Sequence, residues 1–448
     1  MEAVWGKVKF SMLIGRDHEY TYLEEYRKRP GSQLLVFYGQ KFLGKTAFLL
    51  DFCKDRPFSY CLAKPGCEDR ILEELKSEAE RLSQYSKTEK KLLIIDEFQH
   101  LSKSERFMPF CLNLLEKESI LILFVSTACS WVESSMVKCF GKNAARISGF
   151  YKFRELSFSG ICKEYPDYPK EELFLLYSVL GGVPGLWNFM DMKKGAIENI
   201  REQVLSDRSY LRHAGYQYCL EGLRESGVYD TILTAMAQGN AKLNDLHRVT
   251  GYSRAKISVY LKALMEQGQI EKVYSIDCPG RENAQKGIYE ISSHFTDFWF
   301  TFIYLREKEL IRYGEAEFYD RYIKEKLADY CNPYFQKIVK EYFVLCGIVG
   351  KDQIARAHRF LGKNNRIDLI WKQEEGYCAV KCGRLKAMTT YEDYRKLTLG
   401  AKEAGVSLNG CYLVSGRDFD EKLTLEAKMK PQLHLLTFDE IMKAFLEN

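Results

Sequence analysis

The fold is decided by residues 34–46, which read Leu-Leu-Val-Phe-Tyr-Gly-Gln-Lys-Phe-Leu-Gly-Lys-Thr. The first five residues form an apolar, β-favouring run, and residues 47–50 (Ala-Phe-Leu-Leu) are typical of the start of a helix. The loop between them, Gly39-x-x-x-x-Gly44-Lys45-Thr46, matches the Walker A pattern at every fixed position. Strand, glycine-rich loop and helix in this order predict a phosphate-binding loop.

Each residue type in this loop suits a nucleotide phosphate. Backbone N–H groups of such a loop close around a phosphate, and the following helix adds its N-terminal dipole. Lys45 is therefore expected to neutralise the β- and γ-phosphates during catalysis, and the Thr46 hydroxyl to bind Mg²⁺. We predict ATP and Mg²⁺ as the cofactors. The predicted nucleotide-contacting residues of the loop are Gly39, Gln40, Lys41, Phe42, Leu43, Gly44, Lys45 and Thr46.

Buried strands alternate with helices around this loop. Residues 92–95 and 120–125 are continuous apolar runs of strand length. Helical patterns at about 68–84 and 104–116 separate the strands. Such alternation predicts an α/β fold with a mainly parallel, doubly wound sheet.

Polar residues follow both of these apolar runs. Asp96 is predicted to hold the Mg²⁺, and Glu97 to polarise the water that attacks the γ-phosphate. Ser126 or Thr127 would contact the γ-phosphate or orient that water, and we select Ser126 as the catalytic candidate. A hydroxyl at this position suits the cap of the next helix nearly as well.

Hydrolysis of this type often needs a further cation at the transition state. Lys142 and Arg146 follow the predicted strands and are the candidates. A lysine cannot make the bidentate phosphate contact that an arginine makes, so Arg146 is the predicted catalytic cation. A solvated surface charge is the alternative for either residue.

The rest of the chain changes pattern twice. Residues 160–225 are mainly helical, interrupted by Gly-Gly-Val-Pro at 181–184. Residues 229–272 predict three short helices, and 270–291 alternate like a hairpin with Pro279-Gly280 in its turn, which together indicate a winged helix-turn-helix. From about residue 330 the pattern predicts a separate small α/β domain. Its expected elements are strands at 366–371, 377–382 and 410–415 and a helix at 390–404.

Four short motifs stand out in this chain. They are Ile14-Gly15-Arg16-Asp17-His18-Glu19, Asp-Glu-Phe-Gln at 96–99, Gly-Gly-Val-Pro at 181–184 and Phe-Trp-Phe at 298–300. In combination with the Walker A loop they resemble prokaryotic P-loop ATPases of the AAA+/STAND-like group, which are abundant in archaea. The resemblance implies that Ile14 and Gly15 lie near the adenine. It also implies an ATPase core (1–160), a helical lid (161–225), a winged helix (226–305) and a domain similar to restriction-endonuclease-like nucleases (306–448).

Nuclease chemistry in that last fold needs an acid on one strand and an acid-x-Lys pattern on the next, which hold a metal ion and assist the attacking water. Asp368 fits the first position, but Ala379 stands where the second acid would precede Lys381. In the register shifted by two, Lys381 takes the place of the acid and Gly383 that of the lysine. One carboxylate is too few to hold a catalytic Mg²⁺. We therefore predict a nuclease-like fold without nuclease activity.

DNA contact is a hypothesis for two regions. Arg254 and Lys256 lie near the N-terminus of the predicted recognition helix, where base or phosphate contacts usually arise. The segment 230–297 holds eight bases and eight acids, without the net basic footprint of DNA-binding modules, so a connector or protein-binding role is the alternative. In the C-terminal domain, residues 351–386 hold nine bases and four acids, which indicates either phosphate contact or a solvated face.

The leading hypothesis is an ATP-dependent molecular switch, a Mg²⁺-dependent ATPase coupled to DNA or to a protein partner. A nucleotide-gated regulator without significant hydrolysis is the alternative, and a nuclease effector is a third hypothesis. The chain has no apolar run of membrane-spanning length and no signal-peptide pattern, so we expect a cytoplasmic protein without membrane contact. Its 14 cysteines lack Cys-x-x-Cys pairs, which favours free thiols over zinc. The resemblance also allows a homo-oligomer.

Overall fold

The structure, a computed structural model, describes residues 15–85, 89–220, 225–278 and 287–447. The chain divides into two compact units, one formed by 1–156 with 183–188 and the other by 157–182 with 189–448. The chain therefore passes between the units three times. Within the described ranges, none of the helices combines the length and the apolarity that crossing a bilayer requires.

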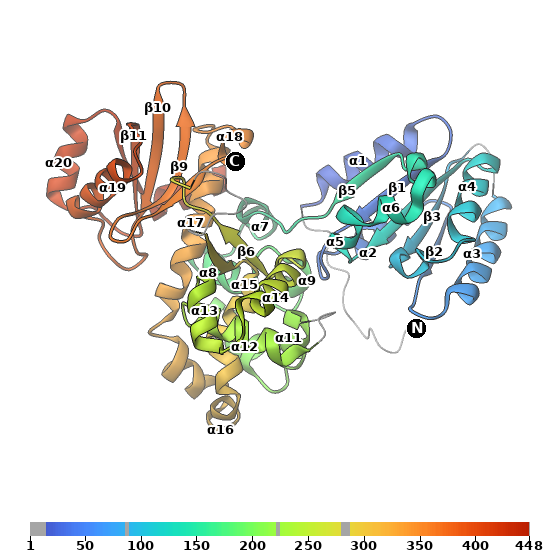
Figure 1. Ribbon diagram of the computed structural model, residues 1–448, viewed down its shortest axis with the longest axis horizontal. Coiled ribbons are helices and arrows are strands. Elements are labelled where there is room, and N and C mark those ends of the chain that lie inside the picture. The colour runs from blue at the N-terminus through green and yellow to red at the C-terminus, as the bar shows by residue number, and fades with distance from the viewer. Residues whose placement is uncertain (1–14, 86–88, 221–224, 279–286, 448) are drawn as a thin grey trace. The chain divides into compact units, whose positions relative to one another are not determined.

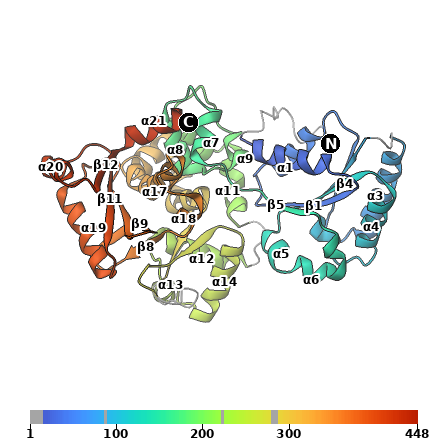
Figure 2. The same ribbon diagram turned by 90° about the horizontal axis from the view of Figure 1, so that it is seen from above.

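The first unit is built on a parallel five-stranded sheet. Its strands, in spatial order, are β2 (Phe58–Leu62), β3 (Lys91–Asp96), β4 (Ile120–Ser126), β1 (Gln33–Tyr38) and β5 (Gly149–Lys152). The strands β3 and β4 are buried along their whole length, because helices cover both faces of the sheet (Figures 1 and 2). This is the sheet of a P-loop NTPase, as predicted.

The helices of this unit hold the sheet between two apolar layers. In α3, for example, the buried residues recur at helical spacing and face the sheet. All strands run in the same direction, so the residues that follow β1, β3 and β4 meet at one edge, the carboxyl edge. The helical elements are α1 (Asp17–Lys28), α2 (Lys45–Phe52), α3 (Glu68–Ser83), η1 (Phe98–Leu101), α4 (Phe107–Lys117), α5 (Cys129–Ser134), α6 (Met136–Phe140), η2 (Gly141–Arg146) and α9 (Pro184–Trp187).

One short segment far along the chain belongs to this unit. Val183–Asn188, which the sequence places in the helical lid, packs with the first unit and contains α9. Pro184 occupies the first turn of α9, where its fixed φ and missing N–H cost nothing. The N–H of Gly185 donates to the carbonyl of Phe42 at 2.8 Å. A Cβ on Gly185 would lie 2.8 Å from that same carbonyl oxygen, so this close approach requires glycine.

The second unit begins with helices and continues with a winged helix. The helices are α7 (Phe158–Glu164), α8 (Lys170–Leu180), α10 (Ala196–Asn199), η3 (Ile200–Leu205) and α11 (Tyr210–Leu220). The winged helix contains α12 (Ser226–Ala237), α13 (Leu243–Thr250) and α14 (Arg254–Glu266), followed by the antiparallel pair β6 (Ile270–Val273) and β7 (Ile288–Ile291). This agrees with the predicted pattern of three helices and a hairpin. The predicted turn at Pro279-Gly280 lies outside the described residues.

A helical segment leads from β7 to the C-terminal sheet. Its elements are α15 (His294–Phe298), η5 (Trp299–Ile303), η6 (Tyr304–Arg306), α16 (Glu307–Phe318), η7 (Tyr319–Ile323), α17 (Leu327–Leu345) and α18 (Lys351–Ala355). The phenylalanines and the tryptophan of the predicted aromatic motif at 298–300 are buried. The motif is therefore part of the core between the winged helix and the elements that follow.

The C-terminal sheet is mixed and forms a small α/β domain. Its spatial order is β12 (Leu433–Thr437), β11 (Leu408–Ser415), β10 (Gly376–Cys382), β9 (Arg366–Gln373) and β8 (His358–Leu361). The first three strands are parallel to one another, whereas β9 is antiparallel to both of its neighbours. The helices of this domain are α19 (Tyr391–Glu403), α20 (Glu421–Met429) and α21 (Phe438–Glu447).

The edge strand β8 is joined to the winged helix. The guanidinium of Arg359 donates to both carboxylate oxygens of Glu290 in β7, at 2.8 and 2.7 Å. The carbonyl of Arg359 accepts from Ile276, and the hydroxyl of the buried Ser275 accepts from the N–H of Leu361. Arg359, one of the nine bases counted in 351–386, is therefore used inside the protein.

A buried carboxyl group lies where α15 packs against α17. The hydroxyl of Tyr334 donates to Asp297 at 2.5 Å, and Thr301 donates to its other oxygen at 3.3 Å. Burial raises the pKa of Asp297 to about 6, against the influence of these two hydrogen bonds and of Lys337. The carboxyl group therefore titrates near the lower end of the physiological range.

This raised pKa predicts a pH-dependent effect on stability. The folded state binds a proton at Asp297 more tightly than the unfolded state, so burial of the charge costs stability above pH 6 and the cost disappears as the pH falls. Replacing Asp297 by asparagine should therefore favour the variant over the wild type more at pH 7.5 than at pH 5, as thermal unfolding would show. An equal difference at both pH values would contradict the prediction.

Candidate functional site

The phosphate-binding loop connects β1 to α2 at the carboxyl edge of the sheet. The N–H of Gly39 donates to the carbonyl of Ser126 in β4 at 3.2 Å, which fixes the start of the loop. A Cβ on Gly39 would lie 2.8 Å from atoms of Phe153, so glycine is required there. Phe42 and Gly44 have φ values of 62° and 80°, and these two left-handed residues make the backbone of the loop curve. Such a turn aims successive backbone N–H groups at a bound anion.

Lys45 begins α2 and folds back over the loop. Its ammonium group donates to the carbonyls of Gly39 and Gln40 at 2.8 and 2.7 Å. The side chain is 5% exposed, and burial lowers its pKa to about 8 even though Glu97 and Asp96 lie close enough to oppose the shift. A phosphate in the loop would offer this ammonium group a stronger acceptor than a carbonyl.

Thr46 and Asp96 come together from the two predicted motifs. The Thr46 hydroxyl donates to Asp96 Oδ2 at 2.7 Å, and the hydroxyl of Tyr60 in β2 donates to the same oxygen at 2.9 Å. The other carboxylate oxygen accepts from the backbone N–H of Glu97. One hydroxyl and one carboxylate fit the way in which proteins bind Mg²⁺ beside a triphosphate, with water and phosphate as the remaining ligands. Elsewhere in the described part of the chain, no three His, Cys, Asp or Glu side chains form a metal cluster.

Glu97 is held by a hydrogen-bonded network at the same edge. Its backbone is left-handed, with φ of 54°, which is unusual for a residue other than glycine and typical of functional sites. Thr127 donates to Glu97 Oε2 at 2.8 Å, and the Gln99 amide donates to the same oxygen. Ser126 in turn donates to the Gln99 carbonyl at 2.7 Å and accepts from the N–H of Ala128. The Ser126 hydroxyl therefore both supports the chain that follows β4 and reaches Glu97 through Gln99.

The two predicted cations lie away from this edge, and of the two predicted adenine contacts only Gly15 lies within the described ranges. Arg146 is not brought to this edge, because it precedes β5 and lies 4.0 Å from Glu116, which precedes β4. Both residues therefore lie at the amino edge of the sheet, and Lys142 is exposed in the same η2 segment. Ile14 lies outside the described residues. Gly15 has a φ of 58° and contacts the side chain of Leu156.

Arg16 is a buried residue of this site to which the sequence analysis assigned no role. Its guanidinium donates to the carbonyl of Leu43 in the loop at 2.7 Å and to the carbonyl of Arg154 at 3.2 Å. It also forms an ion pair with Glu19 at 2.7 Å, and both residues are less than a tenth exposed. Arg16 therefore joins the phosphate loop to the segment that leaves β5. Gln99 and Tyr60 also lacked an assigned role.

Loss of Arg16 should destabilise the first unit. In an Arg16→Ala variant the buried carboxylate of Glu19 would lose its partner, which typically costs about 3–5 kcal/mol. Denaturant-induced unfolding would measure the change. Arg27→Ala is a matched control, because the pair Arg27–Glu24 is more exposed and should contribute less than about 1 kcal/mol. Equal losses in the two variants would refute the role given to Arg16.

The predicted DNA-contacting residues lie at the start of α14. Ser253 caps this helix by accepting from the N–H of Lys256. Arg254 and Lys256 are both exposed, and each side chain contacts a different neighbouring residue. The Arg254 guanidinium donates to Asn244 of α13 at 2.8 Å, and the Lys256 ammonium group lies 4.7 Å from the centre of the Tyr252 ring.

The acid that fits a nuclease pattern is neutralised within the C-terminal sheet. Asp368 accepts from the N–H of Cys382 at 2.8 Å and lies 3.3 Å from the ammonium group of Lys381. Lys381 thus contacts the carboxylate directly. The mixed sheet makes this region a small α/β domain, and the finer likeness to a nuclease gains no support from the comparisons below.

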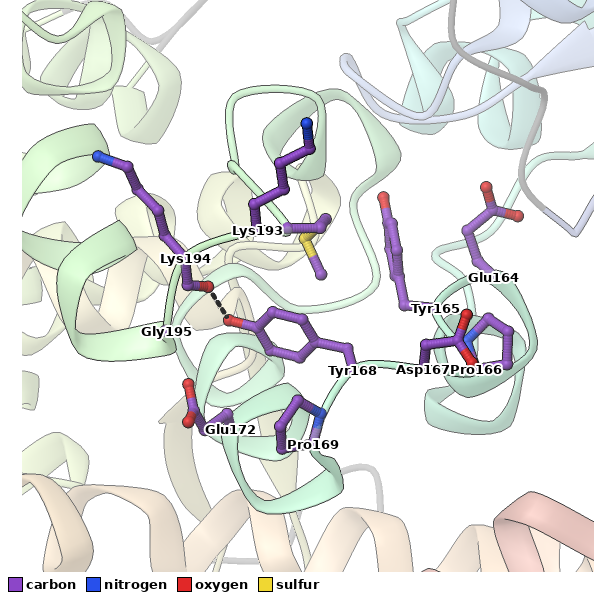
Figure 3. Close-up of a pocket in the computed structure, with 11 residues that line it drawn as sticks. Glu164, Tyr165, Pro166, Asp167, Tyr168, Pro169, Glu172, Lys193, Lys194 and Gly195 are labelled. Atoms are coloured by element: carbon purple, nitrogen blue, oxygen red, sulfur yellow. Dashed lines mark hydrogen bonds between the residues drawn. The ribbon is translucent and has the colours of Figure 1, made fainter.

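A separate crevice of about 400 Å³ lies in the second unit, between the end of α7 and the start of α10 (Figure 3). The Tyr168 hydroxyl crosses it to donate to the carbonyl of Lys194 at 2.8 Å. On its wall, Glu172 accepts from the N–H of Ala196 at 2.6 Å. These groups bind one another and hold the helices together.

The winged helix matches a known family model. Residues 231–272, from α12 to β6, match the bacterial regulatory proteins of the arsR family. The matched residues include α13, α14 and the turn between them, which are the helix-turn-helix described above.

The whole chain is similar to an uncharacterized protein of Methanocaldococcus jannaschii, with 24% identity over 443 residues that cover 92% of this chain and 97% of the relative. Among solved structures, the Walker-type ATPase PABY2304 of Pyrococcus abyssi has a TM-score of 0.44 and 14% identity, covering 64% of this chain and 96% of that one. The ORC2 protein of Aeropyrum pernix, solved as ADPNP–ADP complexes, has a TM-score of 0.43 and 14% identity, covering 67% and 95%. The strand order of the first sheet and the loop 39–46 together indicate the P-loop fold.

Proposed function

We propose that this chain binds ATP and Mg²⁺ at residues 39–46 and hydrolyses ATP slowly, as a molecular switch whose partner is DNA. The observation that carries the nucleotide part is the convergence on Asp96. Thr46, from the loop, lies within 2.7 Å of a carboxylate fifty positions further along the chain, beside the buried Lys45. Such convergence of a hydroxyl, a carboxylate and an ammonium group supports a magnesium–triphosphate ligand.

Each residue of this site has a distinct chemical task in the proposal. Lys45 leaves its two carbonyl acceptors and binds the β- and γ-phosphates. Thr46 and Asp96 would hold Mg²⁺, which when bound supplies positive charge that neutralises the phosphates. Glu97 orients a water molecule and accepts its proton as the water oxygen bonds to the γ-phosphorus and the bond to the β-phosphate oxygen breaks. The products are ADP and phosphate.

The loop contacts two segments that lead into the second unit. Phe153, which follows β5, packs on Gly39, and Gly185 packs on Phe42. Both segments continue directly into the second unit, at Ser157 and at Phe189. A change in the loop on binding or losing the γ-phosphate would therefore shift the chain at these junctions. This supports a switch rather than an isolated hydrolase.

The charge distribution of the winged helix favours DNA over the alternative of a connector. Three of the eight acids counted in 230–297 have partners or burial within the protein: Asp230 is buried, Asp297 is half-buried and hydrogen-bonded to Tyr334, and Glu290 is paired with Arg359. The stretch 242–266, which contains both helices of the turn motif, holds five exposed bases and two acids. A local basic face of this kind is the electrostatic footprint of nucleic-acid binding.

Phosphate release tests the proposal directly. We expect purified protein to release phosphate from ATP in the presence of Mg²⁺, and duplex DNA to change the rate of release. A Lys45→Ala variant should release no phosphate, with or without DNA. Turnover no higher than that of the Lys45→Ala control, with and without DNA, would remove the ATPase part.

A second candidate function is a nucleotide-gated regulator without useful hydrolysis. The observation that favours it is the position of Arg146 and Lys142 at the amino edge, away from the phosphate loop. A protein that retains ATP through gel filtration but releases no phosphate would support this second function.

A further inference from the structure

The exposed face of α14 has an apolar centre between two flanks that carry positive charge. At 100° per residue, the buried Ile257, Leu261 and Leu264 define one side of this helix. On the opposite side lie four exposed residues, Ala255, Val259, Lys262 and Glu266, and the last two form an ion pair at 3.9 Å. Val259 is at the centre of that side and is 67% exposed.

The two positive residues nearest the start of α14 lie on opposite flanks of this face. Arg254 is directed sideways by its hydrogen bond to Asn244 of α13. Lys256, on the other flank, is held over Tyr252 and lies 5.8 Å from the ring centre of Tyr260. Side chains held on the flanks of a helix in a groove meet the sugar–phosphate walls, not the base edges. The residues in the middle of the exposed face of α14 are then the ones that meet the base edges on the floor of the groove.

The Val259 side chain carries no hydrogen-bonding group, so it discriminates bases only by apolar contact. Next to it, Ser258 uses its hydroxyl proton on the carbonyl of Arg254 at 2.8 Å. In the major groove the 5-methyl group of thymine is the apolar feature that distinguishes one base pair from the others. An isopropyl group at the centre of the recognition face matches that methyl group.

We propose that α14 enters the major groove of duplex DNA with Val259 against thymine methyl groups, and with Arg254 and Lys256 on the flanking phosphates. This inference rests on the proposed DNA partner and specifies its chemistry: the duplex contains thymine at the position facing Val259. The exposed bases Arg248 and Lys262 are paired with Asp245 at 3.2 Å and Glu266 at 3.9 Å, so Arg254 and Lys256 carry the phosphate contacts.

Removal of the thymine methyl group tests the proposal. Duplexes enriched from a random-sequence pool by the full-length wild-type protein are resynthesised with deoxyuridine in place of thymidine, which preserves pairing and deletes only the methyl groups. Wild-type affinity should fall roughly fivefold on deoxyuridine DNA, in line with the loss of one good base contact. A Val259→Ala variant should bind the thymidine duplex with the same reduced affinity and show no further loss on deoxyuridine.

Val249→Ala is the matched control, because Val249 is an exposed valine of α13 (50% exposed) and is given no base contact. It should behave as the wild type does. Equal wild-type affinity for both duplexes, or an unchanged deoxyuridine effect in Val259→Ala, would overturn the proposal. If the wild type enriches no duplex at all, the DNA partner itself is lost, whereas phosphate release without DNA still decides the ATPase part separately.

Discussion

Replacing Glu97 by glutamine is expected to lower ATP turnover at least about 100-fold, since a positioned general base contributes that much or more. The glutamine keeps the shape of the side chain and an oxygen that can accept from Thr127, but it cannot take the proton of the attacking water. Binding of ATP should survive, because Glu97 makes no contact with the loop carbonyls that Lys45 occupies. Phosphate release and equilibrium nucleotide binding, measured on the same preparation, would separate the two effects.

Glu133→Gln is a suitable control for this variant. Its carboxylate accepts from Lys152 at 2.7 Å and from Tyr38 at 3.2 Å, close to the end of β1, and it takes no part in the Glu97 network. Turnover by the control should stay near that of the wild type. A Glu97→Gln protein that still hydrolyses ATP at the wild-type rate would show that another group activates the water.

Raising the pH from 7.5 to 9 should weaken ATP binding roughly tenfold. Burial lowers the pKa of Lys45 to about 8, because it disfavours the charged form. A triphosphate binds the protonated side chain, so affinity is full below this pKa and falls with each further unit of pH. The phosphate groups of ATP are already ionised across this range, so their charge does not contribute.

The Lys45→Arg variant separates this effect from other titrations. An arginine keeps its charge to far higher pH, so the variant should bind ATP with little pH dependence between 7.5 and 9, even if its affinity is lower throughout. Isothermal titration at several pH values would measure both proteins. The same decline in both would assign the pH dependence to a group other than Lys45.

The central strands could be predicted from sequence because they are buried on both faces. The strands β1, β3 and β4 read as continuous apolar runs, and the structure begins and ends them within two residues of the prediction. The strands β2 and β5 were not predicted. They lie at the two edges of the sheet, and β5 alternates between half-buried and exposed residues, so neither presents a long apolar run.

The candidate site was predictable where its residues are adjacent in sequence to a strand end. The loop 39–46, Asp96 and Glu97 are of this kind, and the structure brings them together at the carboxyl edge. Arg146 shows that closeness to a strand in sequence does not predict at which edge of the sheet a residue lies. After β4 the chain returns through α5 and α6 to the amino edge before β5 begins, so a residue just before β5 lies at the edge away from the phosphate loop.

The residues that hydrogen-bond to the site residues could be identified only from the tertiary structure. Tyr60 reaches Asp96 only because β2 is the neighbour of β3, which no local pattern indicates. Arg16 and Gln99 had a weak signal, since both lie within the motifs that carry the family resemblance. Their partners, Leu43 and Ser126, lie 27 positions away along the chain.

The junction between Arg359, Glu290 and Ser275 has a consequence for how this protein can be dissected. The strand β8 is the edge of its sheet. Its outward-facing N–H and C=O groups bond to the residues that follow β6. A fragment cut between 305 and 306 would uncover that edge on one piece and leave Glu290 without its guanidinium on the other. Uncovered strand edges pair with other chains, so such fragments should aggregate during purification. A fragment that keeps Ser275, Glu290 and Arg359 on one piece leaves this edge covered.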